Sequence, residues 1–106
     1  MVEFVASGTP RDVSRAIEAY AQDQRSVSAL VVPWESDRQT ISMSVTAVAG
    51  EGWAIEHTNL GTIRLTDLGN DQTRVAADRE PAPEHEKQAR LFDQFAEQIA
   101  RRFRTS

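Results

Sequence analysis

Apolar and polar residues alternate strictly from Thr40 to Ala47 in the middle of the chain, within the segment QTISMSVTAVA at 39–49. Its apolar positions are Ile41, Met43, Val45 and Ala47, with Ser or Thr residues between them. A period of two residues is typical of a strand that packs one face on a core. The segment therefore predicts a strand of an antiparallel sheet. Its Ser/Thr face is expected to be solvated or, alternatively, to contact a second subunit.

Two other segments repeat their apolar residues at helical spacing. Residues 10–24 predict a short amphipathic helix, because Thr9 can cap its start and Pro10 suits the first helical position. The apolar side of this helix, with a period of about 3.6 residues, comprises Val13, Ile17, Tyr20 and Ala21.

The C-terminal segment predicts a longer helix. Pro83 suits its first turn, and Glu84 and Glu86 complement the positive end of the helix dipole. A helix of about 20 residues, at 1.5 Å per residue, is about 30 Å long and can cross a whole sheet. Its apolar stripe comprises Leu91, Phe92, Phe95, Ala96, Ile99 and Phe103.

The remaining apolar segments predict further strands. Residues 2–7 form a short one, and residues 27–34 form one at a sheet edge or bulge, because Pro33 has no N–H group. In the segment WAIEHTNLGTIRLT at 53–66, one continuous strand would place His57 and Asn59 toward the core. Strands usually span about 3–10 residues, so TNLG at its centre alternatively forms a turn or a bulge.

The acidic stretch LTDLGNDQTRVAADRE at 65–80 has the spacing of a calcium loop without its ligands. If Asp67 is the first ligand, Gly69 occupies the place of the second, and Gln72 the place of the glycine that such loops require. Gly69 and Asn70 instead suit the left-handed conformations of a hairpin loop. We therefore expect a turn here and no metal site.

Together the segments predict a single α+β domain over residues 1–106. The expected architecture has two layers, with an antiparallel sheet of five or six strands packed on a long C-terminal helix, in the order β-α-β(4-5)-α. A ferredoxin-like sandwich is disfavoured, because residues 27–80 contain no helical pattern.

The composition excludes several classes of function. With 40% hydrophobic and 26% charged residues, the chain resembles an ordinary folded domain. The absence of cysteine excludes disulfides, zinc–thiolate sites and thiol nucleophiles. A net charge of -4 argues against nucleic-acid binding, which depends on neutralising phosphates. Neither a signal peptide nor a membrane span is predicted, so we expect a cytoplasmic protein without membrane insertion.

Three segments resemble parts of the helix-grip superfamily, which contains START lipid-transfer domains, birch-pollen-type allergens and polyketide cyclases. ASGTPRDVSRAI at 6–17 is similar to its strand-to-helix opening, LGTIRLTDLGNDQTRV at 60–75 to its hairpin, and ARLFDQFAEQIARRF at 89–103 to its closing helix. The resemblance spans most of the chain, which is shorter than members of the superfamily commonly are. It implies a cavity between the sheet and the long helix that accepts an apolar small molecule.

Candidate chemistry is sparse. His57 is the one candidate general base, because histidine titrates near neutral pH, although a surface or turn histidine is the simpler interpretation. His85 has Ala89 where a second metal ligand on a helix would stand. No catalytic residue is assigned, and no cofactor is expected. The residues expected near a ligand, from strand phase and helix stripe, are Met43, Trp53, His57, Asn59, Phe92 and Phe95.

Three classes of function remain open. The first is a small non-catalytic module that binds an apolar small molecule or a protein partner, and the missing catalytic constellation favours it. The second is a homodimeric structural protein with its interface on the long helix or the Ser/Thr face. The third is a cyclase- or dehydratase-like enzyme with His57 in a pocket between sheet and helix.

Overall fold

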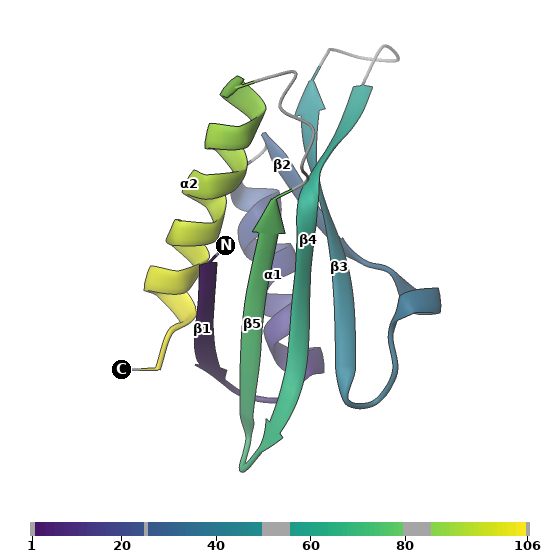
Figure 1. The fold of residues 1–106 in the computed structure, drawn as a ribbon, viewed down its shortest axis with the longest axis vertical. Coiled ribbons are helices and arrows are strands. Elements are labelled where there is room, and N and C mark those ends of the chain that lie inside the picture. Colours follow the sequence, from purple (N-terminus) through teal and green to yellow (C-terminus); the bar gives the residue numbers. More distant parts are fainter. Residues whose placement is uncertain (1, 25, 50–55, 80–85, 106) are drawn as a thin grey trace.

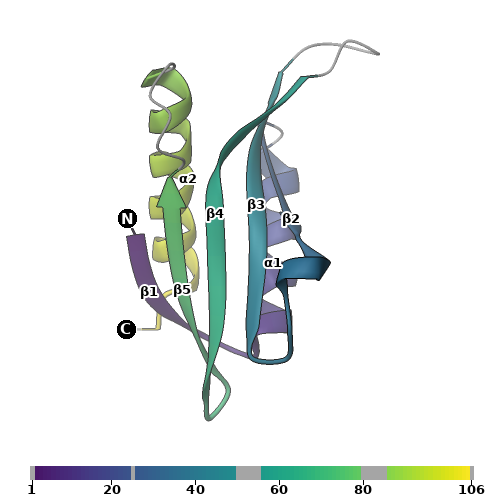
Figure 2. The ribbon, with the colours of Figure 1, turned by 45° about the vertical axis from the view of Figure 1, so that its right-hand side comes forward.

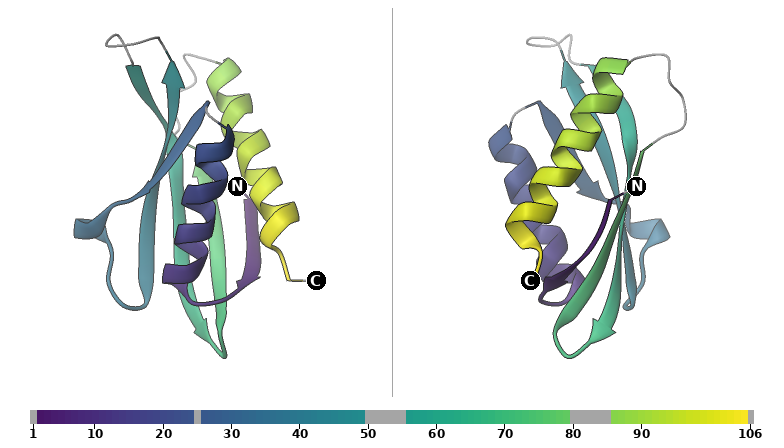
Figure 3. Two further views of the ribbon diagram at one scale, coloured as in Figure 1. Left: turned by 180° about the vertical axis from the view of Figure 1, so that it is seen from behind. Right: turned by 60° about the vertical axis from the view of Figure 1, so that its left-hand side comes forward.

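Five antiparallel strands form one open sheet in the order β1-β5-β4-β3-β2, and both helices lie on the same face of it (Figures 1 and 3). The computed structural model describes residues 2–24, 26–49, 56–79 and 86–105, without the side chains of residues 49, 56–58 and 86–88. The predicted α+β class, antiparallel sheet and C-terminal helix are confirmed. The elements are β1 (Val2–Ser7), α1 (Pro10–Gln24), β2 (Val27–Val31), η1 (Pro33–Glu35), β3 (Thr40–Ala49), β4 (Glu56–Gly69), β5 (Gln72–Arg79) and α2 (Glu86–Phe103).

Helix α1 occupies the predicted range because its start is capped. The Oγ1 of Thr9 accepts the N–H of Asp12 at 3.2 Å, and Pro10 is the first helical residue. The buried residues of α1 are Pro10, Val13, Ser14, Ile17 and Ala21. Within the described ranges, neither helix is apolar over a length that could cross a bilayer.

The core lies between the inner face of the sheet and the two helices. Its largest fully buried apolar side chains are Phe92, Phe95, Ile17, Met43, Ile63, Leu65, Ile99, Val45 and Val75. The two helices also contact each other through Tyr20, whose ring centroid lies 6.1 Å from that of Phe95. The Tyr20 hydroxyl donates to Gln98 Oε1 at 3.2 Å, and the Arg102 guanidinium lies 5.3 Å from the Tyr20 ring centroid.

Strand β4 runs through the segment that the sequence left ambiguous, and it carries a bulge. Val45 pairs with Gly61 and Thr46 pairs with Asn59, so Leu60 is the extra residue on β4. The bulge shifts the alternation of side chains by one position. Asn59 is consequently exposed rather than directed toward the core, while Leu60 and Gly61 are both buried.

The acidic stretch forms the predicted hairpin between β4 and β5, whose tip Figure 2 shows at one end of the sheet. Gly69, Asn70 and Asp71 have positive φ angles of 81°, 54° and 60°. Two successive left-handed residues at 70–71 define a type I′ turn, which matches the twist of the flanking strands. Across the described ranges, no three His, Asp or Glu side chains gather as potential metal ligands.

The residues that follow α2 cover the outer edge of β1. Arg104 forms an antiparallel bridge with Ala6, and the N–H of Thr105 donates to the carbonyl of Val5 at 2.8 Å. The Thr105 hydroxyl donates to the same carbonyl at 3.1 Å. An edge strand exposes unpaired backbone groups, so this tail satisfies groups of β1 that would otherwise face solvent.

Candidate functional site

The residues expected near a ligand do not all lie together. Met43, Phe92 and Phe95 belong to the core and are at most 2% exposed. Asn59 is exposed on β4, beside Thr46. His57 pairs with Val48 in the strand register, but its side chain lies outside the described residues, as does the whole of Trp53. Met43, Phe92 and Phe95 are all members of the buried core cluster.

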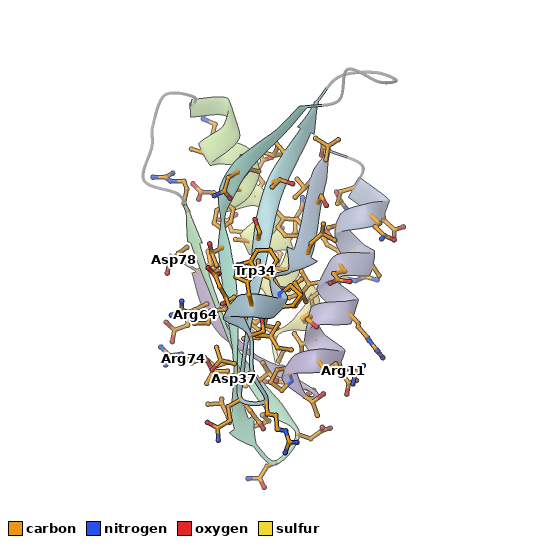
Figure 4. All side chains as sticks on the ribbon, turned by 90° about the vertical axis from the view of Figure 1, so that its right-hand side faces the viewer. Arg11, Trp34, Asp37, Arg64, Arg74 and Asp78 are labelled. Carbon is orange, nitrogen blue, oxygen red and sulfur yellow. The ribbon has the colours of Figure 1, made fainter. Side chains whose placement is uncertain are left out.

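A groove of about 760 Å³ lies elsewhere, on the surface between α1 and the connection from β2 to β3. Small-molecule sites typically have volumes of about 300–1,000 Å³. Figure 4 labels one residue of each wall, Arg11 on α1 and Asp37 in the connection. Asp67, near the end of β4, adds a third side to the groove.

The α1 wall of the groove is a polar helical stripe. Arg11, Ser14, Arg15 and Glu18 all line the groove, and their spacing places them on one side of the helix. The Ser14 hydroxyl donates to the carbonyl of Arg11 at 2.8 Å, so it bonds within its own helix. The two arginine side chains are exposed.

The opposite wall is a short 3-10 helix, η1, that Ser36 holds against the sheet. Pro33 lacks the N–H needed to continue β2, and the chain turns out of the sheet at this residue. The Ser36 hydroxyl donates to the carbonyl of Val32 at 2.8 Å and accepts the N–H of Ser42 at 3.1 Å. Ser42 is only 3% exposed as a result, although its Ser/Thr face was expected to be solvated.

Trp34 stands on η1 with 84% of its surface exposed. Figure 4 shows its side chain in front of the sheet, on the face opposite the helices. It does not line the groove, but its neighbour Pro33 does. Trp34 therefore sits beside the groove on a segment that hydrogen bonds hold in place.

The carboxylates of the groove are bound to backbone amides. Asp37 Oδ1 accepts the N–H groups of Gln39 and Thr40 at 2.8 and 2.9 Å. Asp67 Oδ1 accepts the N–H of Gly69 at 2.9 Å. Glu18 reaches from α1 to the edge of β2, where its Oε1 accepts the N–H of Val31 at 3.4 Å. Each acid thus has a structural role.

The arginines of the groove have no such partners. No carboxylate of the described residues lies within ion-pair distance of Arg11, Arg15 or Arg38. Elsewhere in the described chain, Arg74 pairs with Glu3, and Arg79 pairs with Asp93 at 3.2 Å. Among the described residues, the acids of the groove accept backbone hydrogen bonds, whereas its three guanidinium groups form no ion pair.

Hydrogen bonds from the amides of Thr40 and Gln39 lower the pKa of Asp37 below its ordinary value of 3.8. A carboxyl group with a lowered pKa in the folded state contributes stability above its unfolded pKa. That contribution is lost as the pH falls through the folded-state pKa.

We therefore expect Asp37→Asn to reduce the free energy of unfolding at pH 7, with a difference from wild type that shrinks below pH 3.8. Urea unfolding of both proteins at neutral and acidic pH measures this difference. Asp78→Asn, at an exposed position on β5, is the matched control and should have little effect at either pH. A difference for Asp37→Asn that is equally large in acid would exclude the carboxylate charge as its cause.

No family model matches the chain, and no curated protein or solved structure is significantly similar to it. The candidate site therefore rests on the geometry of the groove itself. None of the residues expected near a ligand from the sequence lines this groove. The available signal was the polar stripe of Arg11, Ser14, Arg15 and Glu18 on a helix whose other side is apolar.

Proposed function

We propose that the protein is a small non-catalytic binding module and that it holds a small organic molecule in the groove between α1 and η1. The observation that carries this proposal is a preformed groove of about 760 Å³. The Ser36 and Asp37 hydrogen bonds fix one wall, and the capped helix α1 fixes the other. A preformed site binds more tightly because little conformational entropy is lost on binding.

The lining of the groove supports a ligand with an apolar part. Pro10, Val31, Pro33 and Ile41 provide apolar surface beside the polar and charged side chains. Ligand sites commonly combine apolar surface with a few polar groups that fix orientation. The groove is not an enclosed cavity, which suits a ligand that is only partly buried.

The state of Asp37 supports a non-catalytic role. A general base works best when its pKa lies near the working pH. The backbone amides of Thr40 and Gln39 shift the pKa of Asp37 in the opposite direction, away from neutrality. Its Oδ1 atom is also occupied by these two hydrogen bonds. We therefore assign Asp37 to the structure of the site rather than to proton transfer.

Membership of the helix-grip superfamily remains part of this proposal, supported by two helices on one face of an antiparallel sheet. The resemblance would place a ligand between the sheet and α2. Met43, Phe92 and Phe95, which were expected to line that space, are buried members of the core. We therefore place the ligand in the groove at α1 instead.

A protein partner is the second candidate, and the exposure of Trp34 favours it. A tryptophan with 84% of its surface exposed is a large apolar group in solvent. Tryptophan is enriched among the residues that dominate the energy of protein interfaces. The hydrogen bonds of Ser36 hold the segment that carries Trp34. Binding of a partner to Trp34 would therefore cost little conformational entropy in this segment.

Binding in the groove is tested by an NMR titration of the wild-type protein with anilinonaphthalene sulfonate, a probe with an apolar body and one anionic group. We expect the largest amide shifts at Arg15, Asp37 and Ile41. The indole N–H signal of Trp34 should move less. The largest shifts around Phe92 or Phe95, or no shifts at millimolar probe, would overturn the groove as the site.

A further inference from the structure

As a deepening of the proposed function, on which this step rests, we propose that the groove selects a ligand with one anionic group, such as a carboxylate or a sulfonate, on an apolar body. Three guanidinium groups that form no ion pair with a described residue line this groove: those of Arg11 and Arg15 on α1, and that of Arg38 in the connection after η1. Guanidinium groups bind carboxylates and sulfonates through paired N–H donors and are the residues best suited to this chemistry.

The positions of Arg11 and Arg15 are unfavourable for the folded protein alone. Arg11 is the second residue of α1, where the helix dipole disfavours a positive charge. Arg15 follows at i+4 on the same side, and like charges at this spacing repel each other. Asp12 follows Arg11 in the first turn of α1, but within the described structure it forms no ion pair with Arg11 or Arg15. A bound anion would relieve this repulsion.

The acids of the groove limit how much negative charge a ligand can carry. Asp37, Asp67 and Glu18 are as numerous as the three arginines, so the formal charges of the lining cancel. A polyanion would be repelled by these carboxylates, whereas a single anionic group can contact guanidinium groups while its apolar body contacts Val31 and Ile41. The three carboxylates are held at the groove, because each accepts a hydrogen bond from a backbone amide.

The anionic group is tested with two probes that differ only by that group. Anilinonaphthalene sulfonate carries a sulfonate, and N-phenylnaphthylamine is the same aromatic body without it. We expect the wild-type protein to bind the sulfonate at least about tenfold more tightly in a fluorescence titration, because hydrogen bonds to charged groups commonly contribute about 1.5–3 kcal/mol. Equal affinity for the two probes would overturn the anionic preference while leaving the groove as a binding site. If neither binds, the proposed function itself fails.

The variant Arg11→Glu separates a binding role from a structural role. It places an acid at the start of α1 and an attractive pair with Arg15, so we expect the melting temperature of the ligand-free protein to rise by about 2–4 °C. The same change should remove the preference for the sulfonate probe. A fall in melting temperature would show that Arg11 stabilises the fold, and an unchanged preference would exclude it from the site.

Arg101→Glu is the matched control. Arg101 lies in the last turn of α2, four residues after Glu97 and 3.9 Å from its carboxylate. The same substitution there should lower the melting temperature, because it places an acid at the negative end of a helix and beside another acid. The preference for the sulfonate should stay at its wild-type value. A loss of preference in this control would mean that net charge, and not the groove, selects the anion.

Discussion

Replacing Phe95 by alanine is expected to lower the free energy of unfolding by about 3–5 kcal/mol. The Phe95 side chain is 2% exposed and packs in the core at the contact between α2, α1 and the sheet. Its removal loses the transfer free energy of the ring and leaves a cavity that the surrounding side chains only partly fill. Domains of this size have total stabilities of about 5–15 kcal/mol, so the variant should be close to unfolding. Urea or thermal unfolding measures the loss.

Trp34→Ala is the matched control, because it removes a larger aromatic side chain from an exposed position. Trp34 is 84% exposed, so little buried surface is lost and the change should be within about 0.5 kcal/mol. Equal losses in the two variants would contradict the burial of Phe95. The pair therefore separates the loss of a buried aromatic side chain from the loss of an exposed one.

Adding one methyl group, in the variant Gly61→Ala, is expected to lower the free energy of unfolding by about 2–3 kcal/mol. A Cβ atom there would overlap the backbone carbonyl of Asp78 and approach the Phe92 ring, 2.7 Å from its Cε2. The carbonyl belongs to the neighbouring strand and cannot move without disturbing the pairing of β4 with β5. Gly61→Ala therefore tests whether the bulge at Leu60 brings β4 this close to α2.

A double-mutant cycle with Phe92→Leu identifies the source of this loss. If the Phe92 ring causes part of the overlap, Gly61→Ala should lower the free energy of unfolding by less in the Phe92→Leu background than in the wild type. Thr62→Ala, at the next residue of β4, is the control for a change on the same strand without this contact. A Gly61→Ala variant as stable as the wild type would be incompatible with the close approach of β4, β5 and α2.

Much of the fold could be predicted because local signals and tertiary packing agree. Thr9 and Pro10 set the start of α1, and its apolar side faces the sheet as expected. Gly69 and Asn70 tolerate positive φ, and the chain reverses there. The segment with Pro33 was expected at a sheet edge, and β2 is an edge strand that ends at Val31, before η1 begins at Pro33. In each of these places the residue type itself favours the local backbone conformation.

The bulge could not be located from the sequence. Its position depends on how β3 and β4 align, which shifts between Val45 and Thr46. A shift of one residue reverses the face of every side chain beyond it. The inward direction expected for Asn59 in a continuous strand is wrong for this reason.

The groove could not be predicted because its two walls are distant in sequence. Arg11 and Arg38 line the same space only when α1 packs beside β2 and the following connection folds back as η1. No local sequence pattern predicts that these two segments lie side by side. The candidate site predicted from the sequence instead followed the most apolar positions, Phe92, Phe95 and Met43, which the fold uses for its core.

The pairing of Val5 with Thr105 also has a consequence for the order of folding. These residues are 100 positions apart, whereas β2, β3, β4 and β5 are joined to their neighbours in succession. Contacts between distant residues form slowly, because a long loop must close first. We expect the four consecutive strands to assemble early, with β1 joining β5 afterwards. On the ribosome, the outer edge of β1 must wait for residue 105 to be synthesised before it is covered.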